Sequence, residues 1–467
     1  MVKKIFNKIT RKNYYIALGV ICLLTLVLFF PSLFTFYTND DFFHLRLANV
    51  SSLGAFINFF NLLKSPEGWG LYRPLTTQVF YFLTVKLFNL NPLPLHIISF
   101  VTLFIIIYLV GELTILLTGN RKVAIFAALL YATSATHFGH LYFLGTYQEL
   151  GMALFFLLSI ICFFKDKTII SLLFFILAIM SKETALVLPF ILVLIQWYLK
   201  KKFNYLLLPY FVVGGVYLFL RFRYFGFASG DSYVWNFSPL KAINTLGWYG
   251  LWSFNIPETL VDFIGPGLHL NPNLLKYWAK EIIPIFILFV LQMFIIFGLL
   301  VKSAKKLVLF SLFWFVITLG PVLFLPIHKF TYYLTLPLIG VVIFVSNLIL
   351  SARVSRVVAV LFILCWLTTS YFTISLTRTT NWITTGASTA KRVYDYFSQN
   401  QDKYIGKTIV FYDTPDDANL PWSPTQVVKV VLSDNNFFDV FFPQLASKIS
   451  YSDRGEVGIG SRQFLGY

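Results

Sequence analysis

Charged residues are scarce in this sequence. Asp, Glu, Lys and Arg make up 12% of its 467 residues, whereas 58% are hydrophobic and the mean hydropathy is +0.74. Soluble domains carry about 25% charged residues. The shortage of charge therefore excludes an ordinary soluble protein and indicates that most of the chain lies in lipid.

Acidic residues are the scarcer kind, because 20 Asp and Glu stand against 37 Lys and Arg, a formal net charge of +17. A nucleic-acid-binding protein would gather such cations on one solvated face. Here they form short clusters between apolar runs, a distribution typical of the positive-inside rule and of contact with anionic lipid headgroups. We therefore expect membrane lipids as partners and no nucleic acid.

Cysteines are few and repeats are missing. The three cysteines, Cys22, Cys162 and Cys365, each lie inside an apolar run, which excludes a disulfide framework and indicates packing residues. The sequence contains no internal repeat, which excludes a repeat architecture.

Long apolar runs dominate the first 376 residues. A spanning helix needs about 20 apolar residues, and loops rich in Lys and Arg stay cytoplasmic. The segment Met1–Lys12 carries five Lys or Arg before the run Tyr14–Leu33, and no small-residue cleavage site follows; we predict an uncleaved signal anchor with a cytoplasmic N-terminus. The two rules together predict about eleven spans, at residues 14–34, 94–117, 123–140, 150–164, 168–180, 185–199, 204–222, 282–301, 307–325, 332–350 and 357–376.

The same path assigns the loops. Its cytoplasmic turns are the basic ones, at residues 119–122, 165–167, 200–202, 302–306 and at Arg353 with Arg356. The first outer loop, 35–93, and an outer segment, 223–281, lie on the opposite side, with 73–88 as a juxtamembrane helix and 242–263 as interfacial helices. The expected location is the plasma (inner) membrane, with the C-terminus extracytoplasmic.

The composition becomes that of a soluble segment from about Thr377 onward. Apolar residues between Trp382 and Phe397 fall on one face at helical spacing, which predicts a helix. Residues 407–412 and 426–432 are predicted strands, separated by the turn signals of 414–417. Residues 377–467 are thus expected to form a small extracytoplasmic α/β domain, without a catalytic constellation of its own.

Two adjacent carboxylates open the first outer loop, in the stretch that runs from Thr38 through Asp40, Asp41 and His44 to Arg46. One interpretation is structural, because Asn and Asp cap the start of a helix well. The other is chemical. A carboxylate beside a second one, near a low-dielectric boundary, has its proton affinity raised and can act as a general base.

Other polar groups occur where hydropathy alone would not place them. His137, His140 and Glu149 lie between the third and fourth spans, and Lys182 and Glu183 lie in a tight hairpin between the fifth and sixth. Ionisable residues at that depth mark a substrate path, although Lys182 could simply snorkel and the histidines could be structural. The cations predicted on the outer side would suit a lipid phosphate; they are Arg73, Lys182, Arg221, Arg223, His328 and Lys329.

Four segments in order form a wider pattern: "NDDFFHL", "LYRPLTTQVFYFLTVKLFNLNPLPLHIISF", "THFGHLYFLGTYQELGMALFFLLSI" and "MSKETALVLPFILVL", with a weaker fifth, "LPIHKFTYYLTLPLIG". They resemble segments of the GT-C superfamily, the multispanning glycosyltransferases that use polyprenyl-phosphate sugars. The nearest branches are the protein O-mannosyltransferases and the lipid A aminoarabinose transferases. One group of the protein O-mannosyltransferases carries tetratricopeptide repeats. No such array follows the spans in this sequence, which removes the argument for the protein acceptors of that group.

The resemblance implies an all-α polytopic membrane protein with a GT-C-like bundle in residues 1–376. It implies an inverting transfer from a polyprenyl-phosphate-linked sugar to a protein, glycan or lipid acceptor, with Asp40 as the base that activates the acceptor and Asp41 supporting it. Arg73 and Lys182 would hold the lipid phosphate. The other expected substrate contacts are His44, His137, His140, Glu149, Glu183, Arg221, Arg223, His328, Lys329 and Tyr332.

A divalent cation, Mg or Mn, could bind the acidic pair, and the sequence leaves the metal open. Two other functions also stay open. A lipid or polysaccharide transporter or flippase would need charges near mid-membrane and inverted halves, and only Glu112 comes near the interior of a predicted span. A noncatalytic GT-C-fold scaffold for envelope assembly has the same sequence signature as an enzyme.

Overall fold

The protein is predominantly helical in a computed structural model that describes residues 9–63, 71–202, 204–226, 233–265, 267, 269–300, 305–350, 354–452 and 456–466. Residues 1–8, 302–304 and Arg353, which helped to assign the topology, lie outside these ranges. Within them, seven helical segments are long and apolar enough to cross a membrane: Arg11–Phe34, Leu93–Thr118, Leu144–Phe164, Tyr205–Tyr224, Asn273–Leu300, Lys305–Leu323 and Arg356–Thr380. The polytopic helical membrane character is therefore confirmed, by length and composition.

Shorter apolar helices accompany them, at Thr168–Ser181, Glu183–Tyr198 and Pro337–Ile349. The predicted third span is occupied by α6 (Arg121–Ala132), which has 12 residues. At about 1.5 Å per residue such a helix is shorter than the hydrocarbon core of a bilayer. The count of eleven spans stays a prediction.

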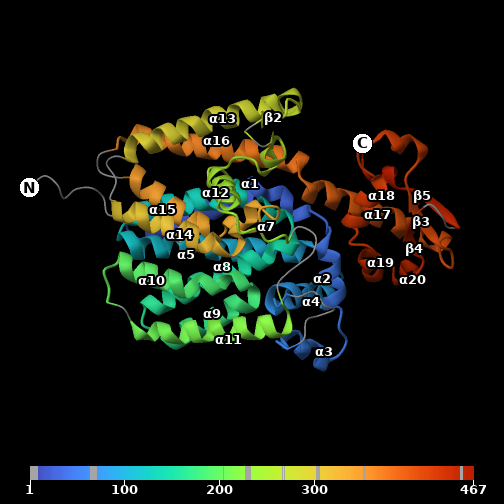
Figure 1. The fold of residues 1–467 in the computed structure, drawn as a ribbon, viewed down its shortest axis with the longest axis horizontal. Coiled ribbons are helices and arrows are strands. Elements are labelled where there is room, and N and C mark those ends of the chain that lie inside the picture. Colours follow the sequence, from blue (N-terminus) through green and yellow to red (C-terminus); the bar gives the residue numbers. More distant parts are fainter. Residues whose placement is uncertain are drawn as a thin grey trace, which may run out of the picture.

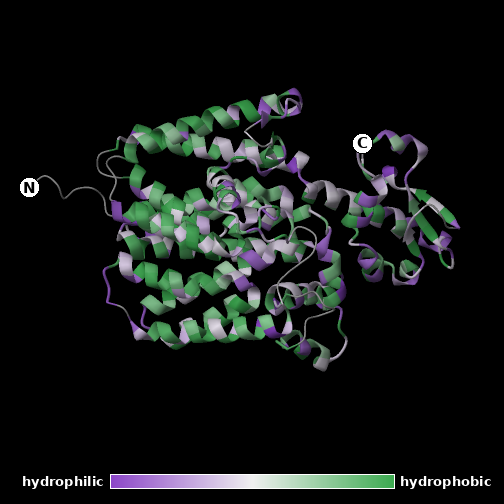
Figure 2. Ribbon diagram, in the orientation of Figure 1, coloured by the Kyte–Doolittle hydropathy of each residue, from purple (hydrophilic) through white to green (hydrophobic). Residues whose placement is uncertain are grey.

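The helices lie side by side in one bundle (Figure 1). They are α1 (Arg11–Phe29) with η1 (Phe30–Phe34), α5 (Leu93–Thr118), α6, α8 (Tyr147–Phe164), α9 (Thr168–Ser181), η7 (Glu183–Val187) with α10 (Leu188–Tyr198), α11 (Leu208–Tyr224), α13 (Asn273–Leu300), α14 (Lys305–Leu323), α15 (Pro337–Ile349) and α16 (Arg356–Thr380). The C-terminal residues form a separate lobe at one end of the bundle. We call this end of the bundle the domain end. Figure 2 shows the bundle as mainly hydrophobic, whereas the lobe mixes hydrophobic and hydrophilic residues.

Hydrogen bonds reinforce the apolar packing inside the bundle. Ser159 of α8 donates to the carbonyl of Ser171 in α9 at 2.8 Å, and Tyr210 of α11 donates to the Ser171 hydroxyl at 2.6 Å. Where no water competes, such bonds hold helices together.

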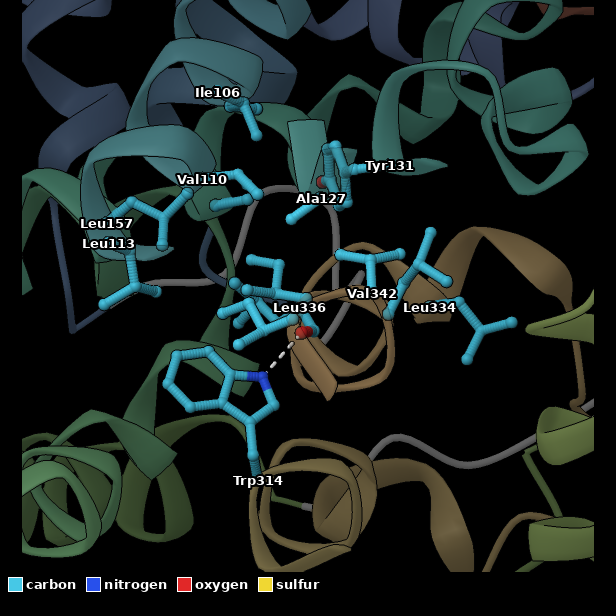
Figure 3. Packing of buried hydrophobic residues seen from close by; sticks show 14 of the residues in the cluster. Ile106, Val110, Leu113, Ala127, Tyr131, Leu157, Trp314, Leu334, Leu336 and Val342 are labelled. Carbon is cyan, nitrogen blue, oxygen red and sulfur yellow. Dashed lines mark hydrogen bonds between the residues drawn. The ribbon is translucent and has the colours of Figure 1, made fainter. Parts of the chain in front are cut away.

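The contact between α14 and α15 is close because a glycine admits an indole ring. Trp314 is fully buried and its Nε1 donates to the carbonyl of Leu336 at 2.8 Å (Figure 3). A Cβ atom added at Gly340 would lie 2.8 Å from Cδ1 of Trp314. Any larger residue at position 340 must therefore push the two helices apart.

Short helices cover the domain end. From the first loop come α2 (Asp40–Ala48), α3 (Leu53–Ile57), η2 (Asn58–Phe60), the π-helix η4 (Pro74–Val79) and α4 (Phe80–Leu87). The predicted juxtamembrane helix at 73–88 is thus helical but divided in two. Later loops add η5 (Ala135–His137), α7 (Phe138–Tyr142), η6 (Leu144–Thr146), α12 (Pro239–Trp252), η9 (Glu258–Asp262), the hairpin β1 (Ile264–Gly265) and β2 (His269–Leu270), and η11 (Thr331–Leu334).

The C-terminal domain is a small α/β unit that begins with α17 (Trp382–Asn400), the helix that the sequence predicts there. Its three strands are parallel in the order β4-β3-β5, with Val410 paired to Ser450 on one side and to Gly458 on the other. The elements after α17 are η12 (Gln401–Lys403), β3 (Ile409–Tyr412), η13 (Pro415–Asn419), α18 (Pro424–Val431), α19 (Asn436–Phe441), α20 (Pro443–Ala446), β4 (Ile449–Tyr451), β5 (Val457–Gly460) and η14 (Ser461–Phe464).

The strand predicted at 426–432 is wrong, because this segment is the helix α18. Its β-branched residues suggested a strand. Ser423 instead caps a helix by accepting from Gln426 N, and Pro424 occupies the first turn. Val428 and Val431, three residues apart, are buried. Capping and helical spacing outweigh β propensity here.

One hydrophobic core joins this domain to the first loop. Phe42 and Leu45 of α2 and Tyr81 of α4 belong to the same buried cluster as Val393 and Phe397 of α17. A salt bridge from Arg46 to Asp439 (3.9 Å) lies on its surface. The segment that carries the acidic pair is therefore held by the C-terminal domain as much as by the bundle.

Replacing Gly340 with alanine should destabilise the protein by about 1–3 kcal/mol, because overpacking a filled contact forces neighbouring groups to shift. The matched control is Gly298→Ala in α13, where nothing lies within 4 Å of the added Cβ and alanine should gain about 1 kcal/mol in helix propensity. Thermal unfolding in detergent micelles measures both changes. Equal melting temperatures for the two variants would contradict the packing described.

Candidate functional site

The two adjacent carboxylates occupy different environments at the start of α2. Asp40, its first residue, is exposed, whereas Asp41 is 1% exposed. The Asp41 carboxylate accepts hydrogen bonds from the backbone N–H of Thr38 at 2.9 Å and from the Tyr81 hydroxyl at 2.5 Å. Burial raises the pKa of Asp41 to about 7, and the bonds from Tyr81 and Thr38 oppose that rise. Asp41 is thus a buried anchor, while Asp40 faces outward.

The residue before Asp40 is clamped by the C-terminal domain. Asn39 has a positive φ of 49°, and its backbone N–H donates to the carbonyl of Val431 at the end of α18, at 2.8 Å. Its side chain makes no capping hydrogen bond to α2. The structural interpretation of this stretch therefore predicts the start of the helix correctly. It is wrong about the cap, because the Asn39 side chain makes no hydrogen bond to the helix. Gly386 of α17 packs against Thr38, where an added Cβ would lie 2.6 Å from the hydroxyl oxygen.

Two buried ion pairs lie beside this segment. Arg73, directly before η4, forms a two-pronged pair with Glu183 at the start of η7, and its Nε lies 2.8 Å from Glu183 Oε2. Lys182, at the break between α9 and η7, pairs with Glu149 in the first turn of α8. Gln148 accepts a further bond from Arg73. Loop residues far apart in sequence are thus tied together by charge.

A cavity of about 370 Å³ opens next to these pairs. Its polar end is formed by the side chains of Arg73, Lys182, Glu183 and Arg221, and its remaining wall is apolar. The other lining residues are Thr184, Leu186, Val187, Phe190, Leu218, Phe222, Tyr233, Trp235, Gly320, Pro321, Val322, Leu325 and Tyr333. Phe190 and Phe222, on α10 and α11, are 54% and 49% exposed, so the apolar wall continues onto the outer surface of the bundle.

Among the described residues, Arg221 of α11 is the cavity cation that has no salt bridge to a carboxylate. It is 8% exposed, and within the described ranges its Nη1 is buried without a hydrogen-bond partner. A buried donor of this kind carries a desolvation penalty until an acceptor arrives. With Arg73 and Lys182 it makes three cations, against the two carboxylates Glu149 and Glu183. The cavity is therefore suited to an anion.

Aromatic rings complete the polar end. The rings of Tyr233 and His328 lie 4.1 Å apart at 32°, and Lys182 Nζ lies 4.6 Å from the centre of the Tyr333 ring. Burial lowers the pKa of His328 to about 4, with the charges of Lys182 and Arg73 adding to the effect, so this histidine is neutral. The Tyr233 phenol interacts electrostatically with the charges of Arg73, Glu183 and Asp40.

The predicted histidines are structural neighbours of the cavity. His137 and His140 are fully buried and share a bond between their Nδ1 atoms at 3.3 Å, and His140 Nε2 lies 3.0 Å from the carbonyl of Tyr332. Burial lowers the pKa of both rings. His44 is buried against Tyr81, and burial with the charge of Arg73 lowers its pKa to about 3. These neutral rings join loops to one another.

Three of the predicted cations, Arg223, His328 and Lys329, do not line the cavity. Arg223 is exposed, with its guanidinium 5.7 Å from the ring centre of Tyr224. Lys329 is partly buried, and burial lowers its pKa. Sequence reasoning missed Gln148, Tyr233 and Tyr333. The first is adjacent to Glu149 and the last to Tyr332, so proximity to a predicted residue could have found them; no pattern distinguishes Tyr233.

The acidic pair makes a poor ligand set for a metal. Both oxygens of Asp41 already accept hydrogen bonds, so they are less available to a hard cation, which prefers oxygen ligands. Among the described residues, no three His, Cys, Asp or Glu side chains come together. We therefore derive no step through a metal ion.

Comparisons with known proteins leave the family undefined. No protein-family model, no curated protein and no solved structure matches the chain.

Asp41→Asn should flatten the pH dependence of stability between about pH 4 and about pH 7. The folded-state pKa of Asp41, about 7, exceeds the ordinary value of 3.8, so the folded protein binds this proton more tightly than the unfolded chain. That contribution is complete below about pH 4 and is lost as the pH rises through about 7, by at most about 1.4 kcal/mol per pH unit. Asparagine cannot titrate.

Melting curves from about pH 5 to about pH 8 test this linkage. The control is Asp416→Asn, an exposed acid of the C-terminal domain, which should keep the wild-type slope. Parallel slopes for wild type and Asp41→Asn would show that Asp41 does not titrate in this window.

Proposed function

We propose that the protein is a membrane glycosyltransferase of GT-C type that moves a sugar from a polyprenyl-phosphate donor to an acceptor, with inversion. The observation that carries the proposal is the cavity in which buried cations meet an apolar wall continuous with the surface of the bundle. A donor of this class has the same two parts, a phosphate and a long hydrocarbon chain. The domain end would face the extracytoplasmic side of the plasma (inner) membrane.

The donor would lie with its isoprenoid chain along Leu186, Phe190 and Phe222, and with its phosphate at Arg221. Arg73 and Lys182 would add positive potential without leaving their carboxylate partners. Charge-assisted hydrogen bonds from arginine suit a phosphate well. As the bond from the anomeric carbon to the phosphate oxygen breaks, the leaving group keeps the electron pair, and the cations stabilise its growing charge.

Asp40 would act as the general base. It would take the proton of the acceptor hydroxyl or amine while the acceptor's oxygen or nitrogen bonds to the anomeric carbon. Three features support this role: Asp40 is exposed, it acts electrostatically on Tyr233 at the polar end of the cavity, and its position is set by the clamp on Asn39. Asp41, engaged with Tyr81 and Thr38, would orient the segment.

The position of the charges favours an enzyme over a transporter. Glu149, Lys182 and Glu183 lie at the first or last turns of α8, α9 and η7, at the domain end. A passage through the membrane would place such groups along its length. The acceptor, whether protein, glycan or lipid, would approach from the domain end.

Asp40→Asn should lower the rate of sugar transfer about 10²- to 10⁴-fold, the usual contribution of a general base, with the melting temperature unchanged because Asp40 is exposed. The assay incubates the purified protein with a set of polyprenyl-phosphate sugars and acceptor extracts and measures release of polyprenyl phosphate. Asp416→Asn, on the surface of the C-terminal domain, is the matched control. Transfer at the wild-type rate by Asp40→Asn would refute the assignment.

Arg221→Gln should weaken donor binding about tenfold to a hundredfold, because a hydrogen bond to a charged group contributes about 1.5–3 kcal/mol. The loss should appear in KM for the polyprenyl-phosphate sugar more than in kcat. Arg223→Gln removes the same charge two residues away, on an exposed part of α11 outside the cavity lining. If both variants raise KM equally, the effect is general electrostatics and the cavity is not the phosphate site.

A further inference from the structure

A second groove, of about 850 Å³, lies where the bundle meets the C-terminal domain. One wall comes from membrane helices, through η1 and the start of α5, and the other from the last turn of α16 and from α17. Thr35 and Phe36 line it. These residues lead to Asp40. The groove and the candidate donor cavity share none of their lining residues.

The groove is cationic. Arg378, Lys391 and Arg392 line it, and no Asp or Glu of the part of the chain that the structure describes does. Lys391 pairs with the exposed Asp395 on the next turn of α17, and Arg392 Nε donates to the carbonyl of Phe464 at 2.6 Å. An exposed ion pair of this kind contributes little and exchanges easily. Arg378 is exposed and adjoins the Tyr142 phenol. The ligand that complements this lining is an anion.

The groove is also apolar on the side of the bundle. Pro31, Leu33, Phe34 and Leu93 form that wall, and Phe34 is 70% exposed. All four belong to the end of α1 with η1 or to the start of α5, where helices long enough to span a membrane terminate. Phospholipid phosphates lie at this level, just outside the hydrocarbon core. The wall is therefore placed to meet acyl chains, and the cations to meet a headgroup.

Backbone strain marks the rim. Asn89 and Leu90, which both line the groove, have positive φ values of 48° and 58°. A bulky residue such as leucine rarely adopts this conformation, and strain of this kind gathers at ligand sites. The loop is held in place by Thr84, which donates to the carbonyl of Asn91 at 2.9 Å.

We propose that this groove is a specific binding site for a bilayer phospholipid with an anionic headgroup. The phosphate lies among Arg378, Lys391 and Arg392, and the acyl chains pass along Phe34 and Leu33 toward the membrane. A bound lipid bridges the end of α1 and α17, and so fastens the C-terminal domain to the bundle beside the Thr35–Asp40 segment. The site does not depend on the proposed transferase activity.

Lipid titration of the full-length protein tests the site. Native mass spectrometry in detergent compares phosphatidylglycerol with phosphatidylcholine, and wild type should bind phosphatidylglycerol at least about fivefold more tightly, the factor that one cation near an anionic headgroup contributes. The double variant Arg378→Gln/Lys391→Gln should lose the preference. Lys276→Gln/Lys407→Gln, which removes two exposed lysines outside the groove, should keep it. Equal affinity of wild type for the two lipids, or an unchanged preference in the groove variant, overturns the proposal.

A second set of measurements tests whether the bound phosphate belongs to a phospholipid or to a soluble anion. Phe34→Ser removes part of the apolar wall without touching a cation, and it should weaken phosphatidylglycerol binding about tenfold. Phosphatidylglycerol should raise the melting temperature of wild type, and inorganic phosphate at the same concentration should not. If inorganic phosphate protects equally, or if Phe34→Ser binds lipid as wild type does, the groove takes a soluble anion and the lipid assignment is wrong.

Discussion

A charge buried away from water must be paired, and this constraint organises the domain end. Arg73 with Glu183 and Lys182 with Glu149 are mostly buried pairs from three separate stretches of chain. Removing one partner of such a pair costs about 3–5 kcal/mol, a large part of the about 5–15 kcal/mol that stabilises a typical fold. The first loop, the start of α8 and the hairpin after α9 are therefore held together beside the cavity.

The pairing also separates the roles of the cations. Arg73 and Lys182 are committed to carboxylates and set the potential of the cavity, whereas Arg221, with its buried Nη1, has hydrogen-bonding capacity left for an incoming group. A similar division separates the two adjacent acids. Asp41 is engaged in the interior while Asp40, one residue earlier, stays at the surface. Neighbours in sequence thus serve structure and, in the proposed mechanism, chemistry.

The C-terminal domain is part of this arrangement. Its α18 carbonyl holds Asn39, its Gly386 admits Thr38, and its core includes Phe42 and Leu45 of α2. The acidic segment therefore runs between the bundle and the domain, and the proposed phospholipid groove adjoins it at Thr35 and Phe36. A change in how the domain sits on the bundle would move Asp40 directly.

The sequence by itself determined the membrane character, the helical class and the soluble tail, because apolar run length and charge spacing are local properties that survive without a partner. It also identified candidate polar site residues, because ionisable side chains between apolar runs are energetically costly and are therefore easy to recognise in a sequence. Only the tertiary structure decided that 426–432 is a helix, which of Asp40 and Asp41 faces outward, and that Arg73 and Lys182 are already paired while Arg223 lies outside the cavity. Burial and pairing depend on residues distant in the sequence, from 33 positions for Glu149 and Lys182 to 110 for Arg73 and Glu183, and no local pattern encodes them.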